Sequence, residues 1–88
     1  MNSGYNSYTL TIMLPTNTTS ITIDWIMMET TYGSLEILAG HTPLLAVLQP
    51  NTTITFQPSG TISETSMPIN QGICQVERNH VTIIMQHA

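Results

Sequence analysis

Basic side chains are almost absent from this sequence. Arg78 is the only lysine or arginine among 88 residues, and five acidic residues give a formal net charge of -4. A chain so poor in cations cannot neutralise a row of phosphates or anchor itself to an anionic membrane, which excludes nucleic acid as a partner and a direct membrane anchor. Charged residues of both signs make up only 7% of the chain, where about a quarter is usual.

Cysteine and long apolar runs are also scarce. The single cysteine, Cys74, cannot form an internal disulfide, whereas small secreted domains usually depend on several. No apolar run approaches the ~20 residues that a transmembrane helix needs. The first residues have neither the basic nor the apolar region of a signal peptide. Together these features favour a cytoplasmic location.

Groupings of residues that would support catalysis or metal binding are missing as well. A zinc site needs three or four ligands at characteristic spacing, and no paired motif joins His41, Cys74, His80 and His87. The carboxylates are spread too widely for an acid–base pair, and there is no glycine-rich phosphate loop or nucleophile elbow. We expect no catalysis, cofactor or metal, a buried Cys74, and His80 and His87 facing solvent.

Threonine, serine and asparagine fill the place of the missing charges, and β-branched threonine suits a pleated strand. Apolar and polar residues alternate over residues 8–14 and 21–27 with the period of a half-buried strand. In the second segment this alternation places Trp25 in the core. Further short strands are expected over residues 35–38, 52–56, 61–69, 73–76 and 80–85. The pattern predicts an all-β sandwich or barrel, with residues 1–88 as one domain.

One segment carries conflicting signals. Thr42 is a good helix N-cap residue, Pro43 suits the first helical position, and good helix formers follow. Pro50, however, ends the segment after barely two turns, and so short a helix is marginal without strong packing. These residues by themselves leave a short helix and an extended segment both open.

Glycines, prolines and a histidine gather between residues 33 and 50, and loops shaped in this way tend to bind a partner. Gly33 and Gly40 are expected to permit a positive φ or the close approach of another backbone. The run over residues 31–45, TYGSLEILAGHTPLL, resembles the signature of the epsilon subunit of bacterial and chloroplast ATP synthases. The matching positions fall in register without a gap, and they are Gly33, Leu35, Ile37, Leu38, Gly40, His41, Pro43, Leu44 and Leu45.

The resemblance extends to the turn over residues 48–51 and to residues 72–84, so register is kept over nearly the whole chain. In the turn, Asn51 replaces a usual glycine, and asparagine tolerates the left-handed conformation best among the other residues. The resemblance implies a flattened β-sandwich of about ten short strands, with residues 43–48 extended rather than helical. We follow the resemblance there, against the local helix signal.

The resemblance also implies a non-catalytic rotor subunit in the central stalk of a proton- or sodium-driven ATP synthase. It would bind the gamma subunit and the membrane c-ring, couple rotation to ATP synthesis, and lie peripherally on the cytoplasmic face of the bacterial inner membrane. Family members typically continue into two inhibitory C-terminal helices. Since this sequence stops at Ala88, we expect no C-terminal helical hairpin. An unrelated β-sandwich binding or adhesion module is the alternative.

The resemblance places contacts to the c-ring or gamma in the loops around residues 32–43. Tyr32 and Ser34 stand where the family usually has acids, one of which meets a basic loop of the ring, and Glu36 is a candidate to replace that charge. His41 either contacts a partner or bonds backbone groups of its own turn. The glycines and the proline are expected to shape the loops first. The predicted interface residues are Tyr32, Gly33, Ser34, Glu36, Gly40, His41 and Pro43.

Overall fold

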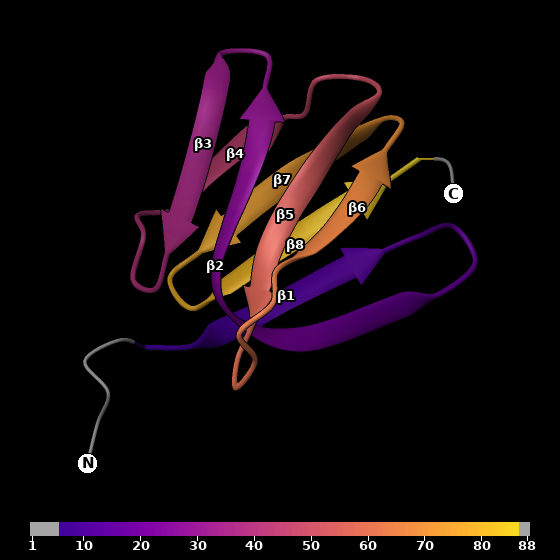
Figure 1. Cartoon of the computed structure of the whole chain (residues 1–88). Coiled ribbons are helices and arrows are strands. Elements are labelled where there is room, and N and C mark those ends of the chain that lie inside the picture. Colours follow the sequence, from indigo (N-terminus) through magenta and orange to yellow (C-terminus); the bar gives the residue numbers. More distant parts are fainter. Residues whose placement is uncertain (1–5, 87–88) are drawn as a thin grey trace.

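The computed structural model describes residues 6–86, which form strands and turns without a helix (Figure 1). The predicted all-β fold is therefore confirmed, and residues 42–48 contain a strand rather than a helix. The sheet has eight strands where the family resemblance implied about ten, and one long strand, over residues 18–30, continues through both layers. The described range accordingly holds no helix that could span a membrane. The strands are β1 (Tyr8–Met13), β2 (Thr18–Thr30), β3 (Gly33–Leu38), β4 (Leu44–Val47), β5 (Thr52–Pro58), β6 (Thr65–Ile69), β7 (Gly72–Glu77) and β8 (His80–Met85).

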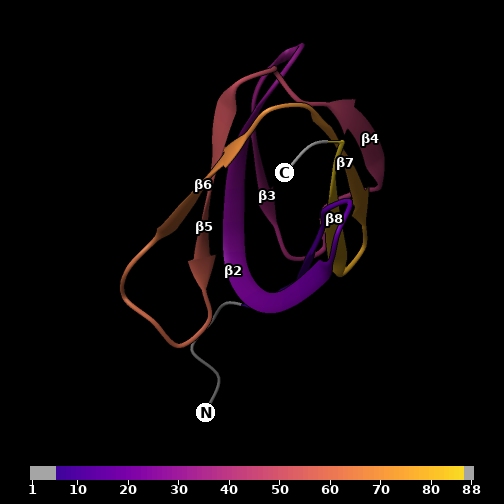
Figure 2. The same cartoon turned by 90° about the vertical axis from the view of Figure 1, so that its right-hand side faces the viewer.

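The strands form a sandwich whose two layers share β2. The hydrogen-bonded order is β4-β7-β8-β1-β2-β5-β6, and β3 pairs with β2 away from this path. The first part of β2 pairs with β1, and its later part pairs with β5 on one side and β3 on the other. Figure 2 shows β2 curving from one layer to the other. One layer is thus β4-β7-β8-β1 with the start of β2, and the other is β3-β2-β5-β6.

A β-bulge in β2 turns this strand from one layer to the other. Ile23 lies opposite Pro58 and Trp25 opposite Gln57, so β2 has one more residue, Asp24, than β5 between these pairs. The Asp24 carboxylate accepts hydrogen bonds from the hydroxyls of Ser7 and Ser59, at 3.1 and 2.8 Å. Bulges of this kind bend a strand and increase its twist. The bulge therefore lets one strand serve two layers.

The bulge also makes one prediction wrong. Regular alternation through residues 21–27 would place Trp25 and Met27 in the core, but Trp25 is only half-buried and Met27 is 45% exposed. The extra residue shifts the alternation by one position, because successive side chains of a strand point to opposite faces. Ile26 and Met28 consequently take the core positions, with 0% and 2% exposure.

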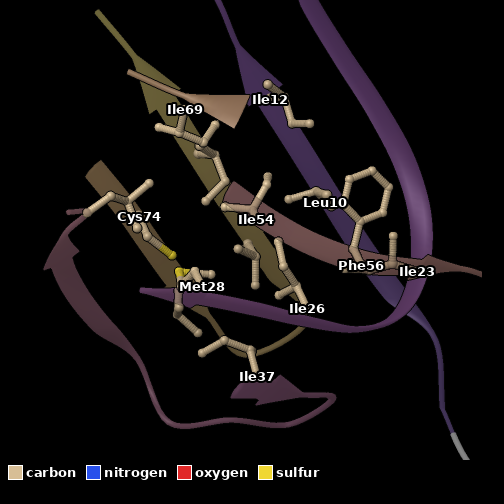
Figure 3. Close-up of a cluster of buried hydrophobic side chains, with 14 of the residues drawn as sticks. Leu10, Ile12, Ile23, Ile26, Met28, Ile37, Ile54, Phe56, Ile69 and Cys74 are labelled. Carbon is tan, nitrogen blue, oxygen red and sulfur yellow. The ribbon is translucent and has the colours of Figure 1, made fainter. Parts of the chain in front are cut away.

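The core fills the space between the two layers with aliphatic side chains from both of them (Figure 3). Cys74 is fully buried among them, as expected for a small hydrophobic side chain. No buried side-chain nitrogen or oxygen in residues 6–86 lacks a hydrogen-bond partner. The buried residues labelled in Figure 3 are Leu10, Ile12, Ile23, Ile26, Met28, Ile37, Ile54, Phe56, Ile69 and Cys74.

Two turns test the sequence predictions further. Asn51 has φ 56°, so asparagine does adopt the left-handed backbone that the family resemblance suggested. The strand predicted over residues 61–69, in contrast, begins only at Thr65. The Gln57 amide donates hydrogen bonds to the carbonyl and hydroxyl of Thr61, at 2.7 and 2.8 Å, and to the carbonyl of Ser63 at 3.3 Å. These bonds hold the segment as a loop and remove it from strand pairing.

Candidate partner-binding site

The predicted interface residues lie at both ends of β3 rather than in one place. Tyr32 lies in the turn between β2 and β3, Gly33 and Ser34 begin β3, and Gly40, His41 and Pro43 lie in the connection from β3 to β4 (Figure 1). A six-residue strand spans about 20 Å at the usual rise of about 3.3 Å per residue. Glu36 lies between the two groups. These residues therefore offer two separate contact regions.

The first region is the β2–β3 corner, which we define as residues 29–34. Thr30 is 5% exposed, and its hydroxyl donates to the Gly33 carbonyl at 2.8 Å and accepts from the Tyr32 N–H at 3.1 Å. Gly33 has φ 124°, the positive value that its sequence context predicted. The Tyr32 side chain is left 98% exposed. The corner thus presents an aromatic ring on a turn that is hydrogen-bonded from inside.

The corner is also tied to the end of β4. The Thr31 N–H donates to the Val47 carbonyl at 3.0 Å, and the Gln49 N–H donates to the Glu29 carbonyl at 2.9 Å. Thr30 and Leu48 form an isolated bridge. Backbone bonds to a neighbouring segment restrict a hairpin tip that would otherwise fray. The corner is consequently a supported part of the sandwich.

A carboxylate that the sequence analysis did not select lies at this corner. Glu29 is directly opposite Ser34 in the β2–β3 ladder, and the Ser34 hydroxyl lies 2.8 and 2.7 Å from the two Glu29 carboxylate oxygens. Glu29 itself is exposed. In a hairpin with a two-residue turn, the second pair of facing residues lies five positions apart in the sequence. Identifying Thr31 and Tyr32 as the turn would therefore have identified Glu29 and Ser34 as that pair.

The second region is the β3–β4 loop, residues 39–43. Gly40 has φ 81°, as expected, and its N–H donates to the Arg78 carbonyl at 3.3 Å. The His41 N–H donates to the Leu38 carbonyl at 3.2 Å, and the His41 Nδ1 lies 2.7 Å from the Thr42 carbonyl oxygen. Of the two roles considered for His41, this geometry matches a turn histidine that bonds nearby backbone groups.

The outer face of the β3-β2-β5-β6 layer carries negative charge. Glu29 in β2 and Glu36 in β3 are exposed. Both point outward, since the residues next to each of them along its strand turn towards the core. Glu64 is exposed too, and it lines a shallow hollow together with Glu29, Met27 and Trp25. We call this surface the acidic face. A face of one sign attracts and orients partners of opposite charge.

The outer face of the other layer is apolar along one row. Val47, Ile73, Ile84 and Met13 are consecutive neighbours across β4, β7, β8 and β1 in the sheet register. Val47 is 53% exposed and Met13 is 40% exposed. Three strand spacings of about 4.8 Å give the row a length of about 14 Å. We call these four residues the apolar row.

The neighbouring row contains no charge, and a hollow opens above the apolar row. Leu45, Gln75, Thr82 and Thr11 form the neighbouring row in the same register. The hollow has a volume of about 300 Å³ and shares Val47, Ile73 and Ile84 with the apolar row. Contiguous exposed apolar surface of this kind marks protein interaction sites. Its residues come from strands far apart in the sequence, which is why composition and spacing did not reveal it.

The remaining chemically reactive residues are engaged internally. Burial raises the pKa of the Cys74 thiol to about 12, so Cys74 is an unreactive core residue near neutral pH. His80 lies on the outer side of β8, since the next residue, Val81, is buried, but it is only half-exposed and its Nε2 lies 2.8 Å from the Thr11 hydroxyl, so the prediction that it faces solvent is confirmed in part. His87 lies outside the described residues. Within residues 6–86 no three side chains of the metal-ligating types come together.

Sequence comparisons identify relatives of the chain. Residues 7–88 match the family model described as the β-sandwich domain of the ATP synthase delta/epsilon chain. The ATP synthase epsilon chain of Frankia casuarinae is 34% identical to this chain over 65 residues, which make up 74% of each protein. The match thus covers most of both chains.

Two solved structures share the fold. A chain of the Euglena gracilis mitochondrial ATP synthase, in an assembly of OSCP, F1 and c-ring, has a TM-score of 0.80 at 19% identity, covering 97% of this chain and 54% of that chain. A chain of the Tetrahymena thermophila mitochondrial ATP synthase central stalk and c-ring has a TM-score of 0.76 at 17% identity, covering 93% and 65%. This chain therefore spans about half to two-thirds of the length of those two. The family match over residues 7–88 shows that this chain belongs to the ATP synthase delta/epsilon family through its β-sandwich domain.

Proposed function

We propose that this chain is a non-catalytic subunit of the central stalk of an ATP synthase, where it binds the gamma subunit and the c-ring and helps to couple rotation to ATP synthesis. Family membership supports the stalk assignment. The two structural neighbours come from mitochondrial ATP synthase assemblies that include the c-ring, and one of them is described as the central stalk. The subunit would lie on the cytoplasmic face of a bacterial inner membrane, held there through the complex.

The observation that carries the proposal is the presence of two unlike outer faces on one small sandwich. A subunit that joins two partners needs two surfaces that can be occupied at the same time. One layer presents the apolar row, and the other presents the acidic face without a lysine or arginine, since Arg78 lies in the turn between β7 and β8. We assign the apolar row to gamma, because permanent interfaces are the more hydrophobic ones. We assign the acidic face and the β2–β3 corner to the polar loops of the c-ring.

The alternative of an unrelated adhesion module has no support in these observations. The family model spans residues 7–88, which leaves no separate part of the described chain for another module. In this proposal the predicted loop residues Gly40 and His41 support β3. Their hydrogen bonds to backbone carbonyls set the path of the β3–β4 loop. Pro43 is exposed directly before β4.

Reconstitution with gamma and the c-ring of the same organism tests the proposal. The unaltered chain should bind both with defined stoichiometry. Replacing Val47 and Ile73 with serine should weaken binding to gamma by at least about tenfold, the loss expected when two hot-spot residues of an interface are truncated. Binding to the c-ring should stay within about twofold. Ile62→Ser is the matched control, because Ile62 is 100% exposed in the β5–β6 loop and lies outside the row. A folded chain that binds neither partner would exclude the proposal.

A further inference from the structure

The free edge of β4 is the least guarded edge of the sandwich. Three strands, β3, β4 and β6, pair with a neighbour on one side only. Natural proteins protect such edges from added strands with charged residues and proline. β3 carries Glu36 and β6 contains Pro68, whereas β4 (Leu44–Val47) has neither a charge nor a proline. Because β4 lies at the outside of its layer (Figure 2), this edge is accessible to a partner.

Hydrogen bonds on either side of β4 show which backbone groups face the free edge. The Leu48 N–H donates to the Gly72 carbonyl at 3.0 Å, so the backbone of Leu48 points towards β7. The Val47 carbonyl accepts from the Thr31 N–H at 3.0 Å and therefore points the other way. Backbone groups alternate in direction along an antiparallel pair, so those of Leu45 also point away from β7. Within residues 6–86 the Leu45 N–H, the Leu45 carbonyl and the Val47 N–H have no hydrogen-bond partner.

Apolar side chains beside this edge are incompletely covered. Leu44 and Ala46 lie on the inward side of β4, four and two residues before the buried Leu48, yet both are only half-buried. Leu45, on the outward side, is 70% exposed. An extended segment laid along a sheet edge bonds the free backbone groups and covers side chains on both faces of the strand. The free backbone groups and the half-covered side chains thus fit the same kind of ligand, an extended peptide.

We infer that β4 binds an uncharged, extended segment of gamma, which adds a short strand to the sandwich. This inference rests on the proposed function and specifies how gamma is held. Val47 belongs to the apolar row that is assigned to gamma, so a strand added beside it continues that row. Leu45 and its neighbour Gln75 in β7 are uncharged, and a charged segment would lose its water there without a partner charge. Because Thr31 already bonds the Val47 carbonyl, a segment of about three residues satisfies the edge.

Amide hydrogen exchange, measured on the full chain alone and bound to gamma, tests the inference. In the free chain the Leu45 and Val47 amides should exchange within about tenfold of the unfolded rate, because no hydrogen bond protects them. Binding to gamma should slow both amides at least about 100-fold. The Ser66 amide is the matched control. Edge strands place the nitrogen of a proline on their solvent side, so Ser66, two residues before Pro68, presents its amide at the free edge of β6. It should exchange equally in both states.

Two substitutions separate the backbone contact from the side-chain contact. Leu45→Pro removes the free N–H and leaves the bonds between β4 and β7 in place, since the Leu45 backbone does not make them. It should weaken binding to gamma by at least about tenfold, because a hydrogen bond is lost and the ring blocks the added strand. Leu45→Val keeps the N–H with a side chain of similar size to proline, and should weaken binding by no more than about threefold. Both variants should bind the c-ring as the unaltered chain does, which checks that the sandwich is folded.

The outcomes separate this inference from the proposed function. If the unaltered chain fails to bind gamma, the proposed function is wrong and the inference falls with it. If gamma binds and the Leu45 and Val47 amides exchange as in the free chain, the inference alone is overturned. Equal losses in Leu45→Pro and Leu45→Val would assign the contact to the side chain and overturn strand addition as well. Protection in the free chain that increases with its concentration would show a second copy at this edge and overturn the assignment to gamma.

Discussion

The phenol of Tyr8 in β1 donates a 2.6 Å hydrogen bond to the backbone carbonyl of Ile37 in β3. The two residues belong to opposite layers, and Tyr8 is 5% exposed and Ile37 1% exposed. This bond is a polar link through an otherwise apolar core. Because β3 carries a predicted contact region at each end, the link also fixes the strand from which both regions extend.

Tyr8→Phe should destabilise the fold by about 1–2 kcal/mol, since the substitution keeps the ring and leaves a buried carbonyl without its partner. Urea unfolding followed by circular dichroism measures the change. Tyr32→Phe provides the comparison, because its 98% exposed side chain should contribute less than about 0.5 kcal/mol. Equal effects from the two substitutions would mean that the Tyr8 hydrogen bond adds nothing to stability.

Stability should fall at alkaline pH because of Cys74. Burial raises the pKa of its thiol from an ordinary value near 9.0 to about 12, so the unfolded state releases this proton first. The contribution is complete below pH 9 and declines between pH 9 and 12, at about 1.4 kcal/mol per pH unit. Burial also raises the pKa of Tyr8 from its ordinary value near 10.0, which adds a decline above pH 10.

The measurement is the free energy of unfolding in urea at intervals from pH 7 to about 10.5, where both groups contribute in turn. Cys74→Ala will be less stable throughout, because it leaves a small cavity. Its unfolding free energy should nevertheless stay level between pH 9 and 10. The same decline in this variant would show that another group titrates in that range.

Thr30→Val should destabilise the sandwich by about 1–2 kcal/mol, because the Tyr32 N–H and the Gly33 carbonyl both lose their bond to the Thr30 hydroxyl. Thr30→Ser keeps the hydroxyl and should recover most of the loss. Thr19→Val, at an exposed position of the same strand, should change stability by less than about 0.5 kcal/mol. Hydrogen exchange at the Tyr32 amide reads the corner directly, and unchanged protection in Thr30→Val would contradict the assigned role.

Strand content could be predicted from the sequence because alternation is a local property. The strand predicted over residues 8–14 is β1, which ends one residue earlier, at Met13. The strand predicted over residues 80–85 coincides with β8. In both segments every second side chain is apolar and faces the core. Residues 42–48 show the opposite case: a threonine cap and a proline favour a helix locally. Pairing of Leu44 through Val47 with β7 stabilises the extended form instead, and only the similarity to a known family indicated it.

The candidate site was predicted in part. The glycine and proline positions mark the two loops at the ends of β3, and the positive φ angles of Gly33 and Gly40 follow from the residue type. Glu29 was missed because its position depends on which residue faces it across the hairpin. The apolar row was missed because Met13, Val47, Ile73 and Ile84 lie on four strands, and no local pattern joins them.

The sequence by itself therefore determined the all-β class, the positions of most strands, the loops that need glycine, and the lack of a strongly basic surface on this chain. These properties depend on the type of each residue and on residues a few positions away in the sequence. The tertiary structure decided the bulge at Asp24, the half-buried position of Trp25, and the contents of the two outer faces. Those depend on register between distant strands, where a shift of one residue exchanges the core side of a strand for its solvent side.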